Sequence, residues 1–212
     1  MSNVVAEITM SLDGFVAGPE PSLEEPLGKG GLQLHEWAFR LAAWRQRHGL
    51  EGGDVDVDSE LVERQLAANG AVVMGRKMFS GGDGAWEDDP MANGWWGDDP
   101  PFHNPVFVLT HHPRERLELK GGTSFTFVTD GVESAVAQAR AAAGSKDVLI
   151  AGGAEVIQQS LAAGLVNELQ LHTAPLVLGS GRRLFEGVAP AHLSITEVVS
   201  VPLATHIRLR VQ

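Results

Sequence analysis

Three short segments carry the residues best suited to chemistry, and each lies where an apolar strand should end. They are VVMGRKMF (72–79), VFVLTHHPR (106–114) and VLIAGGAEVI (148–157). In each, an apolar run precedes a polar, basic or glycine-bearing turn, and open α/β sheets bind nucleotide phosphates at such turns. Three of these turns in one chain predict a dinucleotide site.

The first turn contains cations that would attract a phosphate. Gly75 allows a close backbone turn at the strand end, and Arg76 and Lys77 then open a short helix whose free N–H groups and dipole favour an anion. Taken alone, the two cations are better explained as solvated surface charges, because short motifs often occur by chance. In combination with the two other turns, a phosphate site becomes the favoured explanation of these cations.

The second turn offers groups that suit a ribose phosphate beside an adenine ring. Thr110 has a hydroxyl and Arg114 a fixed charge, while His111 and His112 have imidazole donors and flat stacking faces. A histidine pair also suggests a metal. Adjacent residues of an extended segment point in opposite directions, however, and no carboxylate follows at ligand spacing, so we expect no metal site.

The third turn has two consecutive glycines, Gly152 and Gly153, between a buried strand and a helix. Such a backbone can approach a ligand closely, and the helix N-terminus would face a pyrophosphate. An ordinary strand-to-helix turn explains the pair equally well. The turn lacks the G-x-G-x-x-G spacing of a Rossmann fold, and the later turn at 179–181 lacks the G-K-[ST] of a P-loop.

The composition limits the function classes. The 212 residues include 16 Lys and Arg against 27 Asp and Glu, a net charge of −11, so we expect neither nucleic acid nor membrane as a partner. The absence of cysteine excludes disulfides and thiolate catalysis. No signal-peptide pattern or membrane-spanning apolar run occurs, which predicts a cytoplasmic protein. The length and 43% hydrophobic content predict a single domain over 1–212.

Around the three turns, the apolar pattern predicts alternating strands and helices. Strands are expected at 4–10, 72–75, 106–109, 125–128, 147–150 and 166–174, and helices at 32–48, about 58–69, 131–143 and 153–163. This alternation is typical of a largely parallel sheet covered on both faces. Two final strands, 193–201 and 205–211, predict an antiparallel hairpin. Segments rich in Gly and Pro at about 19–58 and 81–105 predict loop-rich insertions.

Four segments carry a family resemblance: MSLDGFVAG (10–18), GAVVMGRKMF (70–79), PVFVLTHHPR (105–114) and the stretch 148–185. Their order resembles the dihydrofolate-reductase-like superfamily, and especially the branch related to the C-terminal reductase domain of the bifunctional riboflavin-biosynthesis deaminase-reductase. The resemblance implies an α/β fold with a mixed, mostly parallel eight-stranded sheet, flanking helices and a C-terminal antiparallel hairpin. It also implies NADPH bound across the strand ends and a homodimer.

The resemblance further implies which residues hold NADPH, with Val16 and Ala17 near the nicotinamide. The other expected contacts are Gly75, Arg76, Lys77 and Met78 to the phosphates, Leu109, Thr110, His111 and Arg114 to the adenosine end, and Gly152, Gly153, Ala154, Glu155 and Val156 to the pyrophosphate and nicotinamide ribose. The cations favour NADPH over NADH, because a 2′-phosphate needs cations where a 2′-hydroxyl usually meets an acid.

The sequence departs from dihydrofolate reductases at one position. Those enzymes place a buried acid at the start of the helix before the GR strand, and the corresponding residue here is Ser59, a candidate substrate contact. Folate is therefore not the expected natural substrate. Aromatic residues of the second insertion suit a lid over a planar ring, although loop packing or a dimer contact explains them equally well. These candidate substrate contacts are Trp86, Trp96, Phe102 and His103.

Three acids are candidates for relaying a proton or orienting the substrate: Asp58, Asp13 and Glu36. Each could instead be a helix cap, a turn residue or a solvated charge, and for Asp13 the turn role is favoured. We expect an NADPH-dependent oxidoreductase that transfers a hydride to a small planar heterocyclic or conjugated acceptor. The alternative is a non-catalytic NADPH-binding sensor or sequestering protein, which Ser59 in place of the acid supports.

Overall fold

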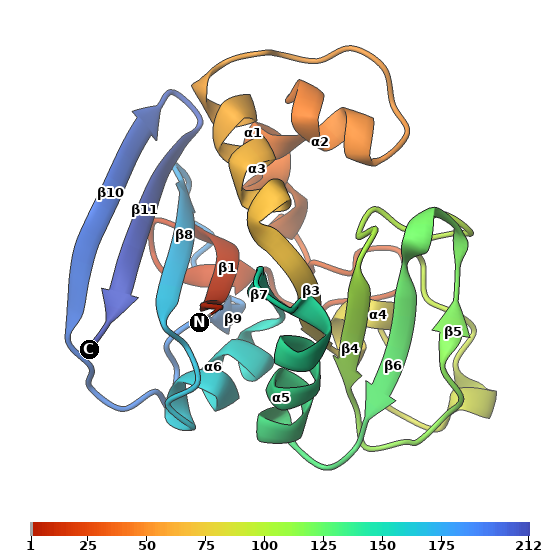
Figure 1. Cartoon of the computed structure of the whole chain (residues 1–212). Helices are drawn as coiled ribbons and strands as arrows, with labels where there is room; N and C mark the ends of the chain where they lie inside the picture. The colour runs from red at the N-terminus through yellow and green to blue at the C-terminus, as the bar shows by residue number, and fades with distance from the viewer. Residues whose placement is uncertain (1) are drawn as a thin grey trace. The chain divides into compact units, whose positions relative to one another are not determined.

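A computed structural model describes residues 2–212 of the chain (Figure 1). The chain divides into two compact units. Unit 1 comprises residues 2–6 and 69–166, and unit 2 comprises residues 7–68 and 167–212. Strand β1 (Val4–Ser11) passes from the first unit into the second.

Unit 1 is a sheet of mostly parallel strands with helices packed on it. Its strands are β3 (Asn69–Gly75), β4 (Pro105–Leu109), β5 (Leu117–Glu118), β6 (Ser124–Val128) and β7 (Asp147–Gly152), in the order β1-β7-β3-β4-β6-β5. Its helices are α4 (Arg76–Ser80), α5 (Val132–Ala143) and α6 (Ala154–Ala162), with short 3-10 turns η2 (Trp86–Asp88) and η3 (Lys120–Gly122). Helix α5 packs against β3 and β4, and in Figure 1 it lies in front of these strands while α4 lies behind.

The strands of unit 1 are continuous apolar runs, because their side chains form the core on both faces of the sheet. Because helices cover both faces of the sheet, side chains pointing either way along β3 and β4 are buried. Val72, Met74, Val106, Val108 and Phe125 form one cluster with exposed fractions of at most 1%. The parallel pairing of β3 with β4 and β7 also brings the C-terminal ends of all three strands to one edge.

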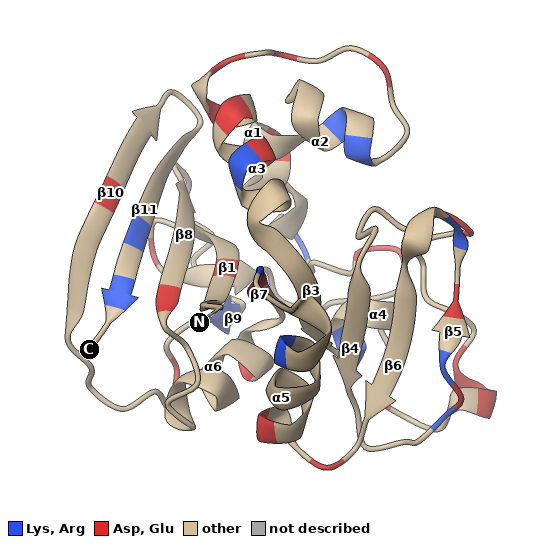
Figure 2. Ribbon diagram, in the orientation of Figure 1, with Lys and Arg blue, Asp and Glu red and all other residues tan. Residues whose placement is uncertain are grey.

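Unit 2 contains strands in the order β10-β11-β8-β1, in which β11 pairs antiparallel with both β10 and β8. These strands are β8 (Glu168–Ala174), β10 (Leu193–Val201) and β11 (Ala204–Val211), and a separate pair consists of β2 (Phe15–Ala17) and β9 (Arg182–Arg183). Its helices are η1 (Gly31–His35), α1 (Glu36–Phe39), α2 (Ala42–Arg47) and α3 (Val57–Ala68). Figure 2 marks basic positions on α2 and acidic positions along the segment between α2 and α3.

The α/β architecture expected from the sequence is confirmed, including the C-terminal hairpin of β10 and β11. Nine strands occur in the two orders, which share β1, and the strand beyond the expected eight is the two-residue β5. The expected continuous helix over 32–48 is wrong. Leu41 has extended backbone angles and forms an isolated bridge with Asp54, which separates α1 from α2, while η1 ends at His35, where the backbone leaves the helical range.

The helices of both units are short. The longest, α3 and α5, have 12 residues each. Within residues 2–212, no helix has both the length and the apolar character needed to cross a membrane.

Candidate functional site

In unit 1, the first and third turns of the sequence lie side by side at the edge of the sheet. Met74 pairs with Gly152 in the parallel ladder between β3 and β7. A Cβ atom on Gly75 would lie 3.0 Å from Val156 Cγ2 and 3.8 Å from the backbone nitrogen of Gly153. The second turn lies at the same edge, because Gly75 pairs with Leu109, the last residue of β4 before that turn. The sheet therefore assembles the three segments that the sequence singled out.

The backbone at the third turn leaves room for a ligand. Gly152 is buried and has a φ of 113°, a conformation that favours glycine. Gly153 is exposed and has a φ of −67°, and a Cβ atom built on it would meet nothing within 4 Å. Helix α6 begins at the next residue, so its first N–H groups lie beside this open glycine. This backbone cradle fits a pyrophosphate.

Arg76 is buried beneath the loop that follows α4. Its guanidinium lies 2.6 Å from the Asp89 carboxylate and 3.4 Å from the centre of the Trp86 ring, and only 6% of its side chain is exposed. Ser80 donates to the same carboxylate at 2.8 Å. Burial acts to raise the pKa of Asp89, but the bonds from Ser80 and Arg76 outweigh it and hold that pKa below its usual range. Nε and Nη2 of Arg76 have no hydrogen-bond partner among the described residues.

The other predicted cations also have partners in unit 1. Lys77 is exposed and forms an ion pair with Asp83 at 3.0 Å. Arg114 donates to the carbonyl oxygen of Ala92 and lies 4.7 Å from the centre of the Trp86 ring. The loop 81–104 thus provides contacts for all three basic residues that the sequence assigned to phosphates.

The remaining predicted nucleotide contacts differ in exposure. Thr110 is buried and its hydroxyl accepts a bond from the backbone N–H of His112 at 3.1 Å. His111 and Glu155 are exposed. The residues that are partly or fully buried are Met78, Leu109, Ala154 and Val156.

The aromatic residues of the loop pack onto the core of unit 1. Trp86 donates its indole N–H to the His112 carbonyl oxygen at 2.9 Å, and its ring lies 4.9 Å from that of Phe127. Trp96 contacts Phe102 edge to face at 4.9 Å. His103 is exposed and has a φ of 50°. Of the three explanations offered for these aromatics, this arrangement favours loop packing over a free lid.

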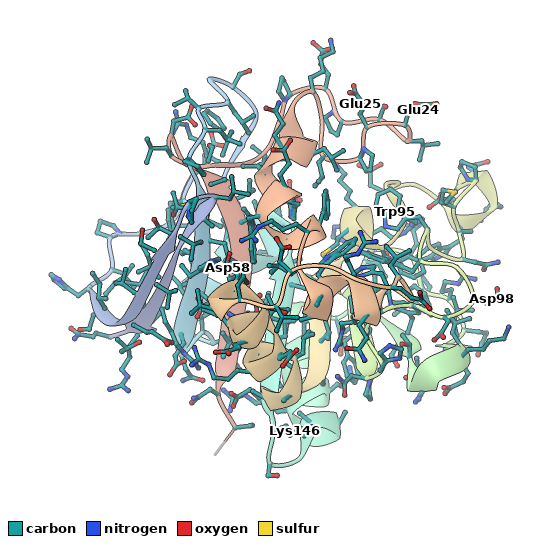
Figure 3. The ribbon with its side chains drawn as sticks, turned by 90° about the horizontal axis from the view of Figure 1, so that it is seen from above. Glu24, Glu25, Asp58, Trp95, Asp98 and Lys146 are labelled. Carbon is teal, nitrogen blue, oxygen red and sulfur yellow. The ribbon has the colours of Figure 1, made fainter. Side chains whose placement is uncertain are left out.

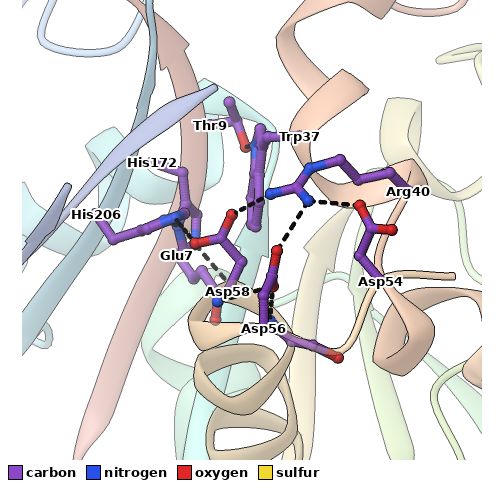
Figure 4. A network of polar contacts seen from close by, with 10 residues as sticks. Glu7, Thr9, Trp37, Arg40, Asp54, Asp56, Asp58, His172 and His206 are labelled. Carbon is purple, nitrogen blue, oxygen red and sulfur yellow. Dashed lines mark hydrogen bonds and ion pairs between the residues drawn. The ribbon is translucent and has the colours of Figure 1, made fainter. Parts of the chain in front are cut away.

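In unit 2, a second cluster of ionisable groups surrounds Asp58 (Figure 4). The guanidinium of Arg40 donates to the carboxylates of Asp54, Asp56 and Asp58 at 2.7, 2.8 and 2.7 Å. The other oxygen of Asp58 lies 3.2 Å from Nε2 of His206. Asp58 is completely buried, and Figure 3 labels it at the start of α3.

The cluster continues from His206 through a second histidine. Nδ1 of His206 lies 2.6 Å from Nδ1 of His172, and Nε2 of His172 lies 3.1 Å from Oε1 of Glu7. The Trp37 ring covers both imidazoles, with ring centres 4.6 and 4.8 Å away, and donates its N–H to the hydroxyl of Thr9 at 3.3 Å. Burial and the neighbouring His172 lower the pKa of His206.

The local sequence explains how these groups meet. His172 and His206 are directly opposite one another in the antiparallel ladder between β8 and β11, so both side chains leave the same face. Asp56 caps helix α3, because its carboxylate accepts the backbone N–H groups of Asp58 and Ser59 at 3.1 Å each. The helix cap, offered above as an alternative role of Asp58, is therefore not the role of that residue. With the cap provided by Asp56, the Asp58 side chain is free to point into the core.

The other predicted residues of unit 2 have separate roles. The Asp13 carboxylate accepts bonds from the Ser11 hydroxyl and from the backbone of Leu178 and Gly179, and the Ser11 bond is the main cause that lowers its pKa to about 2. Asp13 therefore holds a turn. Glu36 is exposed at the start of α1. Ser59 is buried, and its hydroxyl accepts the Ala43 N–H at 3.1 Å. The expected nicotinamide neighbours, Val16 and Ala17, are buried and half-buried on β2.

Sequence reasoning missed Glu7, Arg40, His172 and His206. Each is isolated in the sequence and matches no motif. The one available signal was that His172 and His206 fall on two predicted strands, but strand pairing and register are needed to bring them together. Of the three candidate acids, the structure places only Asp58 in a cluster of ionisable groups.

His35, which precedes α1, makes stability depend on pH. Burial, with a smaller effect of His172, lowers its pKa from 6.5 to about 4. Since the unfolded chain binds a proton near pH 6.5 and the folded chain does not, the stabilisation is complete above pH 6.5 and is lost as the pH falls toward 4. We expect a loss of about 2 kcal/mol between pH 7 and pH 5. Urea unfolding at both pH values should show a loss in His35→Gln that is about 2 kcal/mol smaller than the loss in the wild type and in the exposed-site control His111→Gln. An equal loss in His35→Gln would contradict it.

The mostly parallel sheet, its flanking helices and the C-terminal hairpin fit the dihydrofolate-reductase-like fold. The family model of the RibD C-terminal domain matches residues 2–207, and the chain belongs to this family. This membership supports a reductase of the riboflavin-pathway type. Comparison with curated proteins found no match.

Solved structures share the fold. A Shewanella sp. PV-4 protein provisionally assigned to riboflavin biosynthesis is 22% identical, with a TM-score of 0.65 over 100% of this chain and 99% of that one. The Thermotoga maritima diaminohydroxyphosphoribosylaminopyrimidine deaminase/5-amino-6-(5-phosphoribosylamino)uracil reductase is 15% identical, with a TM-score of 0.56, and this chain covers 57% of its length. The riboflavin biosynthesis reductase Rib7 of Saccharomyces cerevisiae is 13% identical, with a TM-score of 0.53, over 100% of this chain and 89% of that one.

Proposed function

We propose that the protein is an NADPH-dependent reductase that acts on a small planar heterocyclic or conjugated acceptor. The observation that carries the proposal is the backbone cradle of unit 1, in a chain of the RibD C-terminal domain family. Gly75 and Gly152 bring the strand ends together, and the open Gly153 lies beside the N-terminus of α6. Bound NADPH would supply the hydride. The protein would bind its pyrophosphate through these backbone groups and its 2′-phosphate through Arg76.

The residues present suit such a cofactor. Two N–H-bearing nitrogens of Arg76 lack partners within the described part of the chain, and an anion would satisfy them. The exposed His111 is available to the adenosine end. The riboflavin-pathway relatives make an aminopyrimidine the first acceptor to test, and a homodimer remains a prediction for solution measurements.

Calorimetric titration with NADPH and, separately, NADH tests the proposal. Micromolar or tighter binding of NADPH with much weaker binding of NADH would support it, and NADPH oxidation with pyrimidine, pterin, quinone or nitro acceptors would then establish turnover. Binding without turnover across this panel would favour the non-catalytic alternative. Absence of binding for both cofactors would refute the reductase.

Arg76→Ala should weaken NADPH binding about 10- to 100-fold, because one charge-assisted contact contributes about 1.5–3 kcal/mol. NADH binding should stay within about twofold, since it has no 2′-phosphate. The control Lys120→Ala removes another cation of unit 1, which is exposed and pairs with Asp98. Calorimetry on variants whose folding has been verified by circular dichroism provides the measurement. If affinity for both cofactors falls equally, Arg76 does not bind the 2′-phosphate and instead holds the loop in place through Asp89.

A further inference from the structure

Four ionisable side chains of unit 2 form an unbranched chain of hydrogen bonds (Figure 4). Its order is Glu7, His172, His206 and Asp58, and the three heavy-atom separations are 3.1, 2.6 and 3.2 Å. The central contact joins Nδ1 of one imidazole to Nδ1 of the other. Two Nδ1 lone pairs at this distance would repel one another, so a proton must lie between them.

The number of protons shared by these four side chains follows from the geometry of their hydrogen bonds. Three gaps each need one proton, so the four groups together hold three. In one arrangement, Glu7 carries a proton, both imidazoles are neutral and Asp58 is a carboxylate. In the other, Glu7 has passed its proton to the imidazoles, which then carry one positive charge between two carboxylates. The same three protons serve both arrangements, which differ by short shifts along existing hydrogen bonds.

The two ends of the chain differ in access. The Glu7 side chain is 24% exposed, while the side chains of Asp58, His206 and His172 are at most 2% exposed. Asp58 also accepts a hydrogen bond from Arg40 at 2.7 Å. An open depression of about 440 Å³ adjoins Arg40 and Asp56, but Asp58 does not line it. Protons therefore enter or leave at Glu7.

The surroundings of the chain favour a mobile proton. Trp37 covers both imidazoles and excludes water from them. Burial and the charge of His172 lower the pKa of His206, while Asp58 and Glu7 act to raise it. The other charged or titratable groups facing the chain are His35 beside His172, Arg47 near Glu7, and Arg40 with its partners Asp54 and Asp56.

We propose that Glu7, His172, His206 and Asp58 form a store for one proton, which exchanges with solvent at Glu7. When the O–H bond of Glu7 breaks, the proton passes to water and Glu7 becomes a carboxylate. The four groups then hold two protons for three gaps, and a proton taken up from hydronium at Glu7 restores the third.

Nitrogen NMR of the ¹⁵N-histidine-labelled full chain tests the store without any cofactor. We expect one low-field proton resonance coupled to Nδ1 of both His172 and His206, and a single transition in which both imidazoles titrate together. In Glu7→Gln this joint transition should move to lower pH by about 1 unit, because a neutral amide stabilises the imidazolium less than a carboxylate does. Glu25→Gln, on the exposed loop after β2, is the control and should not move it (Figure 3). Separate titrations of the two histidines, or no shift in Glu7→Gln, would overturn the store.

Asp58→Asn keeps the volume of the side chain and should shift the joint histidine transition in the same direction as Glu7→Gln. An unchanged transition in Asp58→Asn would also overturn the store.

Discussion

Replacing Asp58 by alanine is expected to lower the free energy of unfolding by about 3 kcal/mol, the low end of the range for breaking a buried ion pair. The variant leaves Nε2 of His206 without an acceptor in a buried position, and it removes one of three carboxylates from Arg40. The loss is at the low end because Arg40 keeps Asp54 and Asp56. Equilibrium urea unfolding at pH 7 measures it.

Asp54→Ala is the matched control for this prediction. Asp54 also lies 2.7 Å from Arg40, but its side chain is 58% exposed, so its removal should change stability by less than about 1 kcal/mol. Asp58→Asn should fall between the two alanine variants, because the amide keeps the shape and part of the hydrogen bonding. If Asp58→Ala and Asp54→Ala have equal effects, Asp58 has no special role in the stability of unit 2.

Gly153→Val is expected to abolish binding of both NADPH and NADH while the protein stays folded. A side chain at this position would project into the open space that the pyrophosphate must enter. Because the φ of Gly153 is −67° and no atom lies within 4 Å of an added Cβ, the substitution should disturb the surrounding structure little. Thermal unfolding and calorimetry on the same preparation separate the two effects.

Gly84→Val provides the comparison, since a Cβ on Gly84 also meets nothing within 4 Å. Gly84 lies in the loop after α4, outside the backbone cradle, so this variant should bind both cofactors like the wild type. Normal binding by Gly153→Val would remove the glycine pair from the cofactor site. A Gly153→Val protein that no longer folds would show that the open space is needed by the structure itself.

The regular part of the fold could be predicted because its strands are buried on both faces. Continuous apolar runs such as β4 and β7 are visible in the sequence, and the parallel connections place their ends together. The break at Leu41 could not be predicted in this way. The apolar spacing of Leu34, Trp37 and Leu41 is helical, and all three are buried, but the bridge from Leu41 to Asp54 depends on a residue thirteen positions later.

The two clusters differ in how much of them the sequence revealed. Glycines and cations at strand ends are local signals, so the backbone cradle was predicted from Gly75, Gly152 and Gly153. The proton chain depends on the register of β8 against β11 and on the cap that Asp56 provides for α3. Neither the strand register nor this helix cap can be read from the spacing of residues in the sequence. Asp58, which precedes Ser59, is buried because the cap at Asp56 frees its side chain to turn inward.

The pairing of Arg76 with Asp89 changes what cofactor preference would mean. A phosphate that reaches this guanidinium does not neutralise a free charge, because the Asp89 carboxylate already lies 2.6 Å away. Association there is an exchange of one anion for another. The preference for NADPH over NADH would then depend on how much more strongly a dianionic phosphate binds Arg76 than the Asp89 carboxylate does. The loop that carries Asp89 would therefore contribute to cofactor selectivity.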